Sequence, residues 1–212
     1  MTRGIRDGIV TTRYPRRRDD YGPSFRATVT VNDPRDNGEL PEHDAEAIVA
    51  LCPTAAIRSE GGRFRLDRGR CIACGRCVVA LPDVFSFARD IETAELRREV
   101  LVVPPAIDEL AALEALRAEL GTRVRALRRS VHVRHVDCGS DGSEEWEIAA
   151  LTNPVYDVQR LGIYFTASPR HADLLLVTGA GAAGMLGPLA TTFESMPDPK
   201  LGVAVGTDAL SG

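Results

Sequence analysis

Five cysteines are the residues whose type and spacing most clearly indicate chemistry in this chain. Three of them form the run Cys71-Ile72-Ala73-Cys74-Gly75-Arg76-Cys77, and a fourth stands before proline in Cys52-Pro53. A [4Fe–4S] cluster needs four thiolates, and a Cys-x-x-Cys-x-x-Cys run supplies three of them around one face. In such motifs the fourth thiolate comes from a distant Cys-Pro pair, and Cys52-Pro53 has that form. The spacing therefore predicts iron–sulfur chemistry at Cys52, Cys71, Cys74 and Cys77.

Zinc is the alternative occupant of a set of four cysteines. Zinc ribbons bring two separate Cys-x-x-Cys pairs rather than a run of three cysteines, so the spacing favours iron and sulfide. A disulfide framework is not expected, because the amino terminus lacks the apolar core of a secretory signal and three cysteines are closely spaced.

The cysteine segment resembles the bacterial two-cluster ferredoxin family. Leu51-Cys52-Pro53-Thr54-Ala55-Ala56-Ile57 is similar to the end of the first ferredoxin motif, and the run from Cys71 to Cys77 is similar to the second. The other cysteine positions of that pattern are occupied here by Glu42, Ala45, Ile48 and Leu81. In the family those four positions hold one cluster, and the four cysteines that remain hold the other. The resemblance therefore implies one [4Fe–4S] cluster, with Cys52, Cys71, Cys74 and Cys77 as its ligands.

A wider resemblance covers most of the chain. Residues 8–15 (GIVTTRYP) are similar to the N-terminal arm of the two-cluster ferredoxin subunit of membrane-associated [NiFe] hydrogenase and formate hydrogenlyase complexes, the relatives of respiratory complex I. Later segments are similar to a different subunit, the hydrogenase small subunit, which corresponds to the 20 kDa subunit of complex I. These segments are VRHVD at 133–137, NPVYD at 153–157, SPRHAD at 168–173 and PDPK at 197–200. The chain thus resembles a fusion of the two subunits.

The small-subunit resemblance implies a proximal [4Fe–4S] site whose cysteines this chain lacks. Two of the ligand positions fall on Asp141 and Glu144, a third falls on Asp208, and the fourth would lie beyond Gly212. One interpretation is a carboxylate site for Mg²⁺ or Ca²⁺ at the carboxyl ends of parallel strands. The interpretation that we favour is a vacated cavity that opened to water and became lined by charged side chains.

Other candidate residues of the second half are expected to be structural. Gly179–Gly184 has the Gly-x-Gly-x-x-Gly pattern of a dinucleotide loop, but no acidic residue for a ribose follows at a strand end about twenty residues later. His132 and His135 would point to opposite faces of a strand, which disfavours a shared metal. Cys138 and His171 are expected to have no ligand role. A bound nucleotide and a redox role for Cys138 are the minority alternatives.

Periodicity and turn residues divide the chain into four segments, and the resemblance assigns a fold to two of them. The segments are an extended N-terminal arm at 1–41, a ferredoxin-like α+β domain at 42–91, a linker and connecting helix at 92–130, and a flavodoxin-like doubly wound α/β domain at 131–212. Apolar residues at spacings of three and four predict a long helix over 106–129. Shorter predicted helices are at 45–51, 75–81, 143–151 and 185–196. Predicted strands are at 25–31, 63–66, 130–137, 162–167, 173–178 and 201–206.

Composition excludes several classes of function. The 212 residues are 44% hydrophobic and 26% charged, which is typical of a soluble globular chain. The net charge of −4, with the excess of acids after residue 130, argues against nucleic acid binding. No apolar stretch approaches the roughly 20 residues of a membrane span. We expect a cytoplasmic protein, or one held at the inner face of the cytoplasmic membrane through its complex.

The sequence predicts an iron–sulfur electron-transfer subunit of a hydrogenase-like or complex I-like oxidoreductase. The resemblance implies a partner similar to the hydrogenase large subunit or the 49 kDa subunit of complex I, with membrane-bound subunits reached through the complex. No self-contained active site is visible in the sequence, so its status as an enzyme stays open. The alternative is a non-catalytic structural or redox-sensing subunit, whose degenerate small-subunit domain serves as a docking surface.

Overall fold

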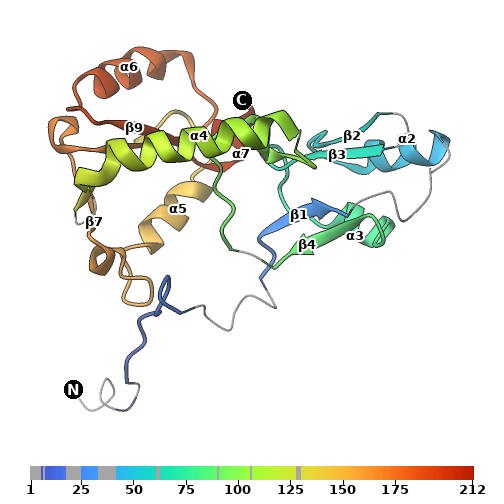
Figure 1. The fold of residues 1–212 in the computed structure, drawn as a ribbon, viewed down its shortest axis with the longest axis horizontal. Helices are drawn as coiled ribbons and strands as arrows, with labels where there is room; N and C mark the ends of the chain where they lie inside the picture. Colours follow the sequence, from blue (N-terminus) through green and yellow to red (C-terminus); the bar gives the residue numbers. More distant parts are fainter. Residues whose placement is uncertain are drawn as a thin grey trace. The chain divides into compact units, whose positions relative to one another are not determined.

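The structure is a computed structural model that describes residues 6, 8–17, 25–32, 42–60, 63–89, 91–105, 107–127 and 130–212. It divides into two compact units, one of Tyr21–Thr122 and one that joins Met1–Asp20 to Arg123–Leu210. Figure 1 labels the elements of both units. This grouping differs from the four predicted segments, because the described residues 8–17 and 25–32 of the predicted arm belong to different units.

The cysteine-bearing unit is built on two small antiparallel sheets. Their strands are β1 (Thr28–Val31), β2 (Ile57–Glu60), β3 (Arg63–Asp67), β4 (Phe85–Ala88) and β5 (Val102–Val103). β1 pairs with β4, and β3 lies between β2 and β5. The helices of this unit are α2 (Glu42–Leu51), α3 (Arg76–Ala80), α4 (Ile107–Arg123) and the 3-10 turn η3 (Glu99–Leu101). The predicted strands at 25–31 and 63–66 and the predicted helices at 45–51 and 75–81 are found at these places.

The core of this unit explains why such short elements hold together. Along β3, exposed and buried positions alternate, and Phe64 and Leu66 are the buried ones. Val29 of β1 and Phe85 of β4 are completely buried, and the rings of Phe64 and Phe85 lie 5.4 Å apart between centroids. Alternation of this kind is typical of a sheet that packs one face on a core. Burial of each such side chain stabilises the fold by roughly 1.5–3 kcal/mol.

The second unit is built on a parallel sheet. Its strands are β6 (Val131–Asp137), β7 (Ile163–Phe165), β8 (Leu174–Thr178) and β9 (Leu201–Ala204). They lie in the order β7-β6-β8-β9, and all three pairs are parallel. The chain therefore starts in the interior of the sheet and proceeds first to one side and then to the other. That change of direction makes a topological switch point at the carboxyl ends of β6 and β8, which is where α/β folds place ligands. The predicted α/β class with a parallel sheet is confirmed.

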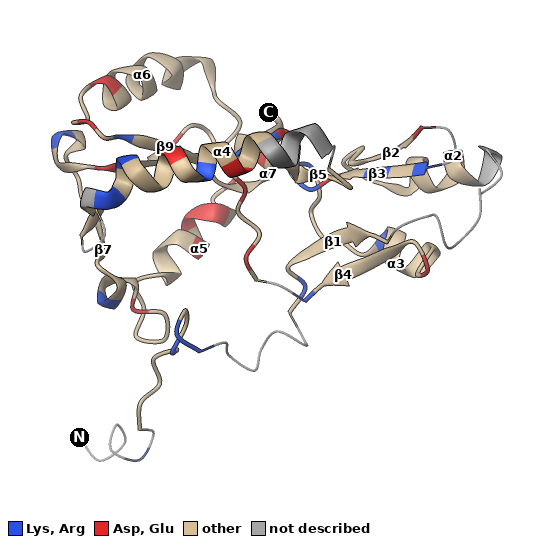
Figure 2. Cartoon of the chain, in the orientation of Figure 1, with Lys and Arg blue, Asp and Glu red and all other residues tan. Residues whose placement is uncertain are grey.

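Helices and 3-10 turns connect the strands of the parallel sheet. They are α5 (Ser143–Ala150), η5 (Val158–Leu161), η6 (Pro169–His171), η7 (Ala183–Met185), α6 (Leu186–Glu194) and α7 (Gly206–Ser211). Acidic and basic residues are interspersed along α4, whereas α5 begins with acidic residues (Figure 2). α4 confirms the long predicted helix and continues as the 3-10 turn η4 (Val124–Leu127). Within the described residues, no helix is both long enough and apolar enough to cross a membrane.

Residues 8–17 of the N-terminal arm are anchored by hydrogen bonds to the rest of the unit with the parallel sheet. The N–H of Thr12 donates to the carbonyl of Val155 at 2.7 Å, and Arg160 Nη2 donates to the carbonyl of Tyr14 at 2.5 Å. The turn that receives the arm starts at Asn153, whose side-chain Oδ1 accepts from the N–H of Val155 at 2.8 Å. Nothing in the sequence marks which part of the predicted arm would be held in this way.

Candidate iron–sulfur centre

The four cysteines that the sequence singled out line one pocket of the cysteine-bearing unit. Cys52 directly follows α2, Cys71 and Cys74 lie on the loop between β3 and α3, and Cys77 lies in the first turn of α3. Cys77 is buried, Cys52 and Cys71 are partly buried, and Cys74 is exposed. The remaining lining of the pocket is largely apolar and includes Val29. The structure thus brings together cysteines that are far apart in the sequence.

A cluster and a single zinc ion place different demands on four cysteines. Among the described residues, no group of three or more His, Cys, Asp or Glu side chains is close enough together to hold one metal ion. Zinc draws four sulfurs to about 2.3 Å of one centre, whereas the thiolates of a [4Fe–4S] cluster bind four different irons and therefore stand further apart. The run of three cysteines in the sequence, rather than any distance between the sulfurs, is what favours a cluster over zinc.

Left-handed backbone conformations mark both cysteine segments. Ala55 and Ala73 each have a φ of 51°, and within the described part of the chain only one other non-glycine residue has a positive φ. For residues with a side chain, this conformation costs about 1–2 kcal/mol and persists where the surroundings demand it. Gly75, with a φ of 76°, follows in the same loop, and a Cβ there would lie 2.8 Å from the ring of Phe87. The loops are therefore shaped for the site at a cost in local strain.

Backbone N–H groups at or next to these strained positions donate to two of the cysteine sulfurs. The N–H of Ala56 donates to Cys52 Sγ at 3.3 Å, and the N–H of Ala73 donates to Cys71 Sγ at 3.4 Å. Hydrogen bonds to sulfur stabilise the thiolate form and are one of the factors that set the reduction potential of a bound cluster. The left-handed turns at Ala55 and Ala73 therefore have a chemical consequence.

The thiols differ in how their surroundings affect the pKa. Burial raises the pKa of Cys52, but hydrogen bonds with Thr54 and from the following backbone outweigh burial and hold that pKa below its ordinary value. Burial raises the pKa of Cys71 and of Cys77, and the neighbouring thiols add to the increase. Negative charge is therefore unfavourable at Cys71 and Cys77 unless a cation compensates for it, as iron does in a cluster.

Asp67 braces the turn that leads from β3 to Cys71. Its carboxylate accepts from the backbone N–H of Gly69 at 2.9 Å and from Arg98 Nη2 at 2.7 Å. Burial raises the pKa of this carboxyl, but the hydrogen bond and charge of Arg98 and the N–H of Gly69 outweigh it, so the pKa lies below its ordinary value of 3.8. The turn closes where the N–H of Cys71 donates to the carbonyl of Arg68 at 3.3 Å. Asp67 therefore fixes the backbone that presents Cys71.

Replacing Asp67 by asparagine should lower the free energy of unfolding by about 1–2 kcal/mol at pH 7, because Arg98 loses its charged acceptor. The folded pKa is depressed, so the stabilisation is complete above the ordinary pKa of 3.8 and is lost as the pH falls through the folded value. The difference between the wild type and Asp67→Asn should therefore shrink near about pH 3. Urea unfolding of both proteins at the two pH values measures this difference in the free energy of unfolding. The same difference at both pH values would contradict the role of the Asp67 charge.

The acids at the predicted proximal positions do not form an ion site among the described residues. Ser143 Oγ donates to Asp141 Oδ1 at 2.6 Å and lies 3.0 Å from Glu144 Oε2. The carboxylate of Glu144 also packs directly against the Cα of Gly206. The carboxylate of Asp208 is bonded to neither of the other two acids. The hydroxyl of Ser143 therefore holds Asp141 and Glu144, and the metal interpretation and the vacated cavity both stay predictions.

A hydrogen-bonded network that the sequence analysis missed closes this end of the parallel sheet. Ser140 Oγ donates to Glu145 Oε2 at 2.6 Å, and the completely buried Thr178 donates its hydroxyl proton to Glu145 Oε1. Thr178 Oγ1 also lies 3.0 Å from His135 Nε2. Because Thr178 gives its one proton to Glu145, it accepts from His135, which places a proton on Nε2. Hydrogen bonds from Ser140 and Thr178 hold the pKa of Glu145 below its ordinary value.

Three successive N–H groups of the glycine-rich loop between β8 and α6 already donate to backbone carbonyls of the neighbouring loop. The N–H groups of Gly181 and Ala182 donate to the carbonyl of Cys138 at 3.1 and 2.8 Å, and the N–H of Ala180 donates to the carbonyl of Gly139 at 3.3 Å. A dinucleotide loop directs such N–H groups at the pyrophosphate. The nucleotide alternative is therefore disfavoured. Cys138 is 1% exposed and burial raises its pKa, which favours a structural role.

Residues 64–117 match the family model described as a 4Fe-4S single cluster domain. The matched residues include Cys71, Cys74 and Cys77 but not Cys52, so the position of Cys52 at the pocket is a separate observation. The family match supports an iron–sulfur cluster on this chain.

Three curated relatives are similar to parts of the chain. Formate hydrogenlyase subunit 7 of Escherichia coli (strain K12) is 39% identical over 110 residues, which cover 52% of this chain and 41% of that protein. The probable membrane-bound hydrogenase subunit mbhJ of Pyrococcus furiosus is 42% identical over 84 residues, which cover 40% of this chain and 50% of that protein. An NADH-quinone oxidoreductase subunit of Citrifermentans bemidjiense is 42% identical over 66 residues, which cover 31% of this chain and 39% of that protein.

The matched regions span half or less of the length of each of these relatives. The expected similarity to hydrogenase and complex I-type subunits is confirmed, whereas the fusion of two subunits and the loss of the proximal cysteines stay predictions. The chain thus combines an iron–sulfur domain with homology to subunits of hydrogenases and of NADH-quinone oxidoreductase.

Proposed function

We propose that this chain is an electron-transfer subunit of a hydrogenase-like or complex I-like oxidoreductase and holds one [4Fe–4S] cluster on Cys52, Cys71, Cys74 and Cys77. The observation that carries the proposal is the convergence of these four cysteines on one pocket, three of them within a segment that matches a single-cluster domain. When bound, the cluster supplies one-electron transfer. The N–H groups of Ala56 and Ala73 stabilise charge on two of the sulfurs.

The two units have separate tasks in this proposal. The cysteine-bearing unit, centred on 42–91, is a ferredoxin-like domain that has kept one of two clusters. The unit with the parallel sheet, 131–212, has the strand order of a flavodoxin-like domain and docks on a large-subunit homologue. Its proximal positions carry acids, and its loops are closed by the bonds of Ser140 and Thr178 to Glu145. Electrons therefore enter or leave through the single cluster.

A structural or redox-sensing subunit is the second candidate function. It is favoured by the network around Glu145, because the hydrogen bonds close the switch point, the place where an α/β unit would hold a cofactor of its own. A redox sensor would keep the cluster but would not pass electrons to a partner. The rate at which the reduced cluster is reoxidised after mixing with the large-subunit homologue separates the two candidates. An electron-transfer subunit should be reoxidised as fast as the assembled complex turns over, whereas a redox sensor should not.

Anaerobic purification, with iron and sulfide counts and EPR after dithionite reduction, tests the cluster itself. We expect about four irons and four sulfides per chain and a reduced-cluster signal. About eight irons would mean that a second cluster binds and that the proximal site is not vacant. Zinc without sulfide would overturn the proposal and leave only a structural role.

A further inference from the structure

A second cavity, of about 420 Å³, lies in the cysteine-bearing unit and is separate from the cysteine pocket. β1 contributes to both: Val29 lines the cysteine pocket, whereas its neighbours Thr30 and Val31 line the cavity. Successive side chains of a strand point to opposite faces, so Thr30 faces away from Val29, whereas Val31 shares the face of Val29 and reaches the cavity further along the strand. The volume falls within the roughly 300–1,000 Å³ that is typical of small-molecule sites.

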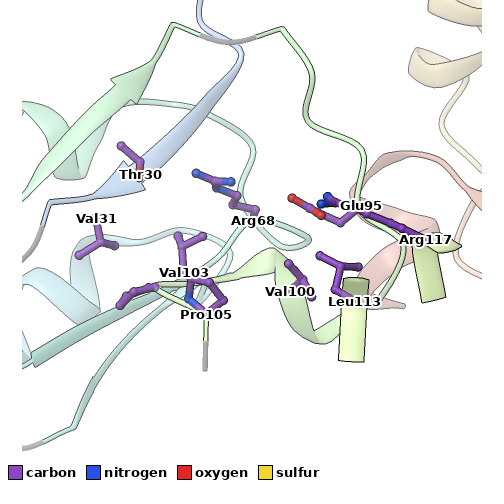
Figure 3. Close-up of a pocket in the computed structure, with 10 residues that line it drawn as sticks. Thr30, Val31, Arg68, Glu95, Val100, Val103, Pro105, Leu113 and Arg117 are labelled. Carbon is purple, nitrogen blue, oxygen red and sulfur yellow. The ribbon is translucent and has the colours of Figure 1, made fainter. Parts of the chain in front are cut away.

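One side of the cavity is apolar and rigid. Val100, Val103 and Leu113 belong to η3, β5 and α4 and are 5%, 7% and 3% exposed. In Figure 3 these residues and Pro105 lie along one edge of the cavity, and Arg68, Glu95 and Arg117 lie along the other. Buried side chains from three different elements make a preformed surface against which an apolar group can pack.

The charged side of the cavity is left incompletely satisfied by the protein. Glu95 Oε2 is buried and has no hydrogen-bond partner. Arg68 donates from Nε to the carbonyl of Val29 at 3.2 Å, and its terminal nitrogens have no acceptor among the described residues. Arg68 and Glu95 attract each other but form no ion pair, and no ion pair ties Arg117 to another described residue. Leaving a buried polar atom without a partner costs about 1–3 kcal/mol, more when it is charged.

A ligand that satisfies these groups must combine three chemical features. Two guanidinium groups beside one carboxylate leave a net positive charge, which favours an anion with acceptor oxygens. The unpartnered Glu95 oxygen needs a hydrogen-bond donor, and the apolar side needs a hydrocarbon chain. We propose that the cavity binds a small organic carboxylate that carries a hydroxyl or ammonium group next to the carboxylate and a short branched alkyl chain. This site goes beyond the electron-transfer function and does not depend on it.

Three matched probes test the site by isothermal titration of the full, iron-loaded chain. They are L-leucine, 2-hydroxy-4-methylpentanoate and 4-methylpentanoate, which share one alkyl chain and carboxylate and differ in the donor. We expect at least one donor-bearing probe to bind and 4-methylpentanoate to bind at least about tenfold more weakly, because it leaves Glu95 unsatisfied. The comparison of leucine with the hydroxy acid shows which donor the site prefers.

Variants identify the groups that act. Glu95→Gln should abolish most of the difference between the donor-bearing probes and 4-methylpentanoate, since the amide is a weaker acceptor than a carboxylate. Arg117→Gln should lower the affinity for every probe that binds by about tenfold, because one guanidinium contact to the carboxylate is lost. Arg97→Gln, an exposed change outside the cavity lining, is the matched control and should leave affinity unchanged. Arg68 is left intact because it also holds Val29 beside the cysteines.

Failure of the site is distinguishable from failure of the proposed function. If no probe binds at millimolar concentration, or if Arg117→Gln and Arg97→Gln bind alike, the ligand proposal is overturned, whatever the iron content. If the three probes bind equally to the wild type, Glu95 does not recognise a donor and the proposed ligand class is wrong. The iron and sulfide counts of the same samples report on the cluster independently.

Discussion

Replacing Cys74 by serine should cost the protein at least one iron per chain and abolish the reduced-cluster EPR signal of the wild type. A [4Fe–4S] cluster needs a thiolate at each iron, and a serine hydroxyl is a poor substitute at neutral pH. Cys74 is exposed, whereas Cys77 is part of the buried core, so this substitution removes a ligand with little loss of packing. Iron and sulfide counts with EPR on anaerobic samples measure the effect.

Cys138→Ala is the matched control for this experiment. Cys138 is the remaining cysteine, lies in the other unit and is 1% exposed. Removing the Cys138 side chain loses some core packing, but we do not assign Cys138 as a cluster ligand. The iron content, the sulfide content and the EPR signal should therefore stay at the level of the wild type. If Cys74→Ser kept four irons and an unchanged spectrum, the assignment of Cys74 would be wrong. If Cys138→Ala lost iron, the fifth cysteine would have to be part of a site.

The elements that the sequence predicts best are those with a strong local signal. The apolar run of β8 predicts a buried parallel strand, and the leucine spacing of α4 predicts a long helix; both are found. β2, β4 and β5 were missed. All three are short. β4 and β5 depend on partners that are distant in the sequence, β1 for β4 and β3 for β5. β2 pairs with β3, which follows it directly, but the sequence of β2 has a single apolar residue and so gives little alternation.

The candidate sites divide in the same way. The cysteine run is local, so its spacing predicts the pocket, and only the approach of Cys52 needs the fold. The Glu145 network joins residues of β6, α5 and β8, and the cavity at Arg68 and Glu95 joins residues from β1 to α4. No spacing rule links such positions. The left-handed conformations of Ala55 and Ala73 were also missed, because alanine gives no sign of a positive φ.

The close approach of two loops at the carboxyl ends of β6 and β8 leads to a second large effect. Gly179 has a φ of 83°, and a Cβ there would lie 2.6 Å from backbone atoms of Gly139 and Ser140. The backbone cannot easily retreat, because the N–H of Ala180 donates to the carbonyl of Gly139 at 3.3 Å and ties the two loops together. Gly179→Ala should therefore lower the free energy of unfolding of this unit by about 3 kcal/mol or more.

Gly181→Ala separates the clash from the backbone strain. Gly181 lies in the same loop with a φ of 80°, but nothing lies within 4 Å of the position that a Cβ would take. Gly181→Ala should lower the free energy of unfolding by only about 1–2 kcal/mol, which is the strain of an alanine in the left-handed conformation. Circular dichroism follows the urea unfolding of both variants, because Trp146, the single tryptophan, is already 79% exposed in the folded unit. Equal losses for both variants would show that the loops are free to separate, and a separable pair would leave room for a cofactor at the switch point. A markedly larger loss for Gly179→Ala means that backbone contact holds this end of the sheet closed, as the single-cluster function requires.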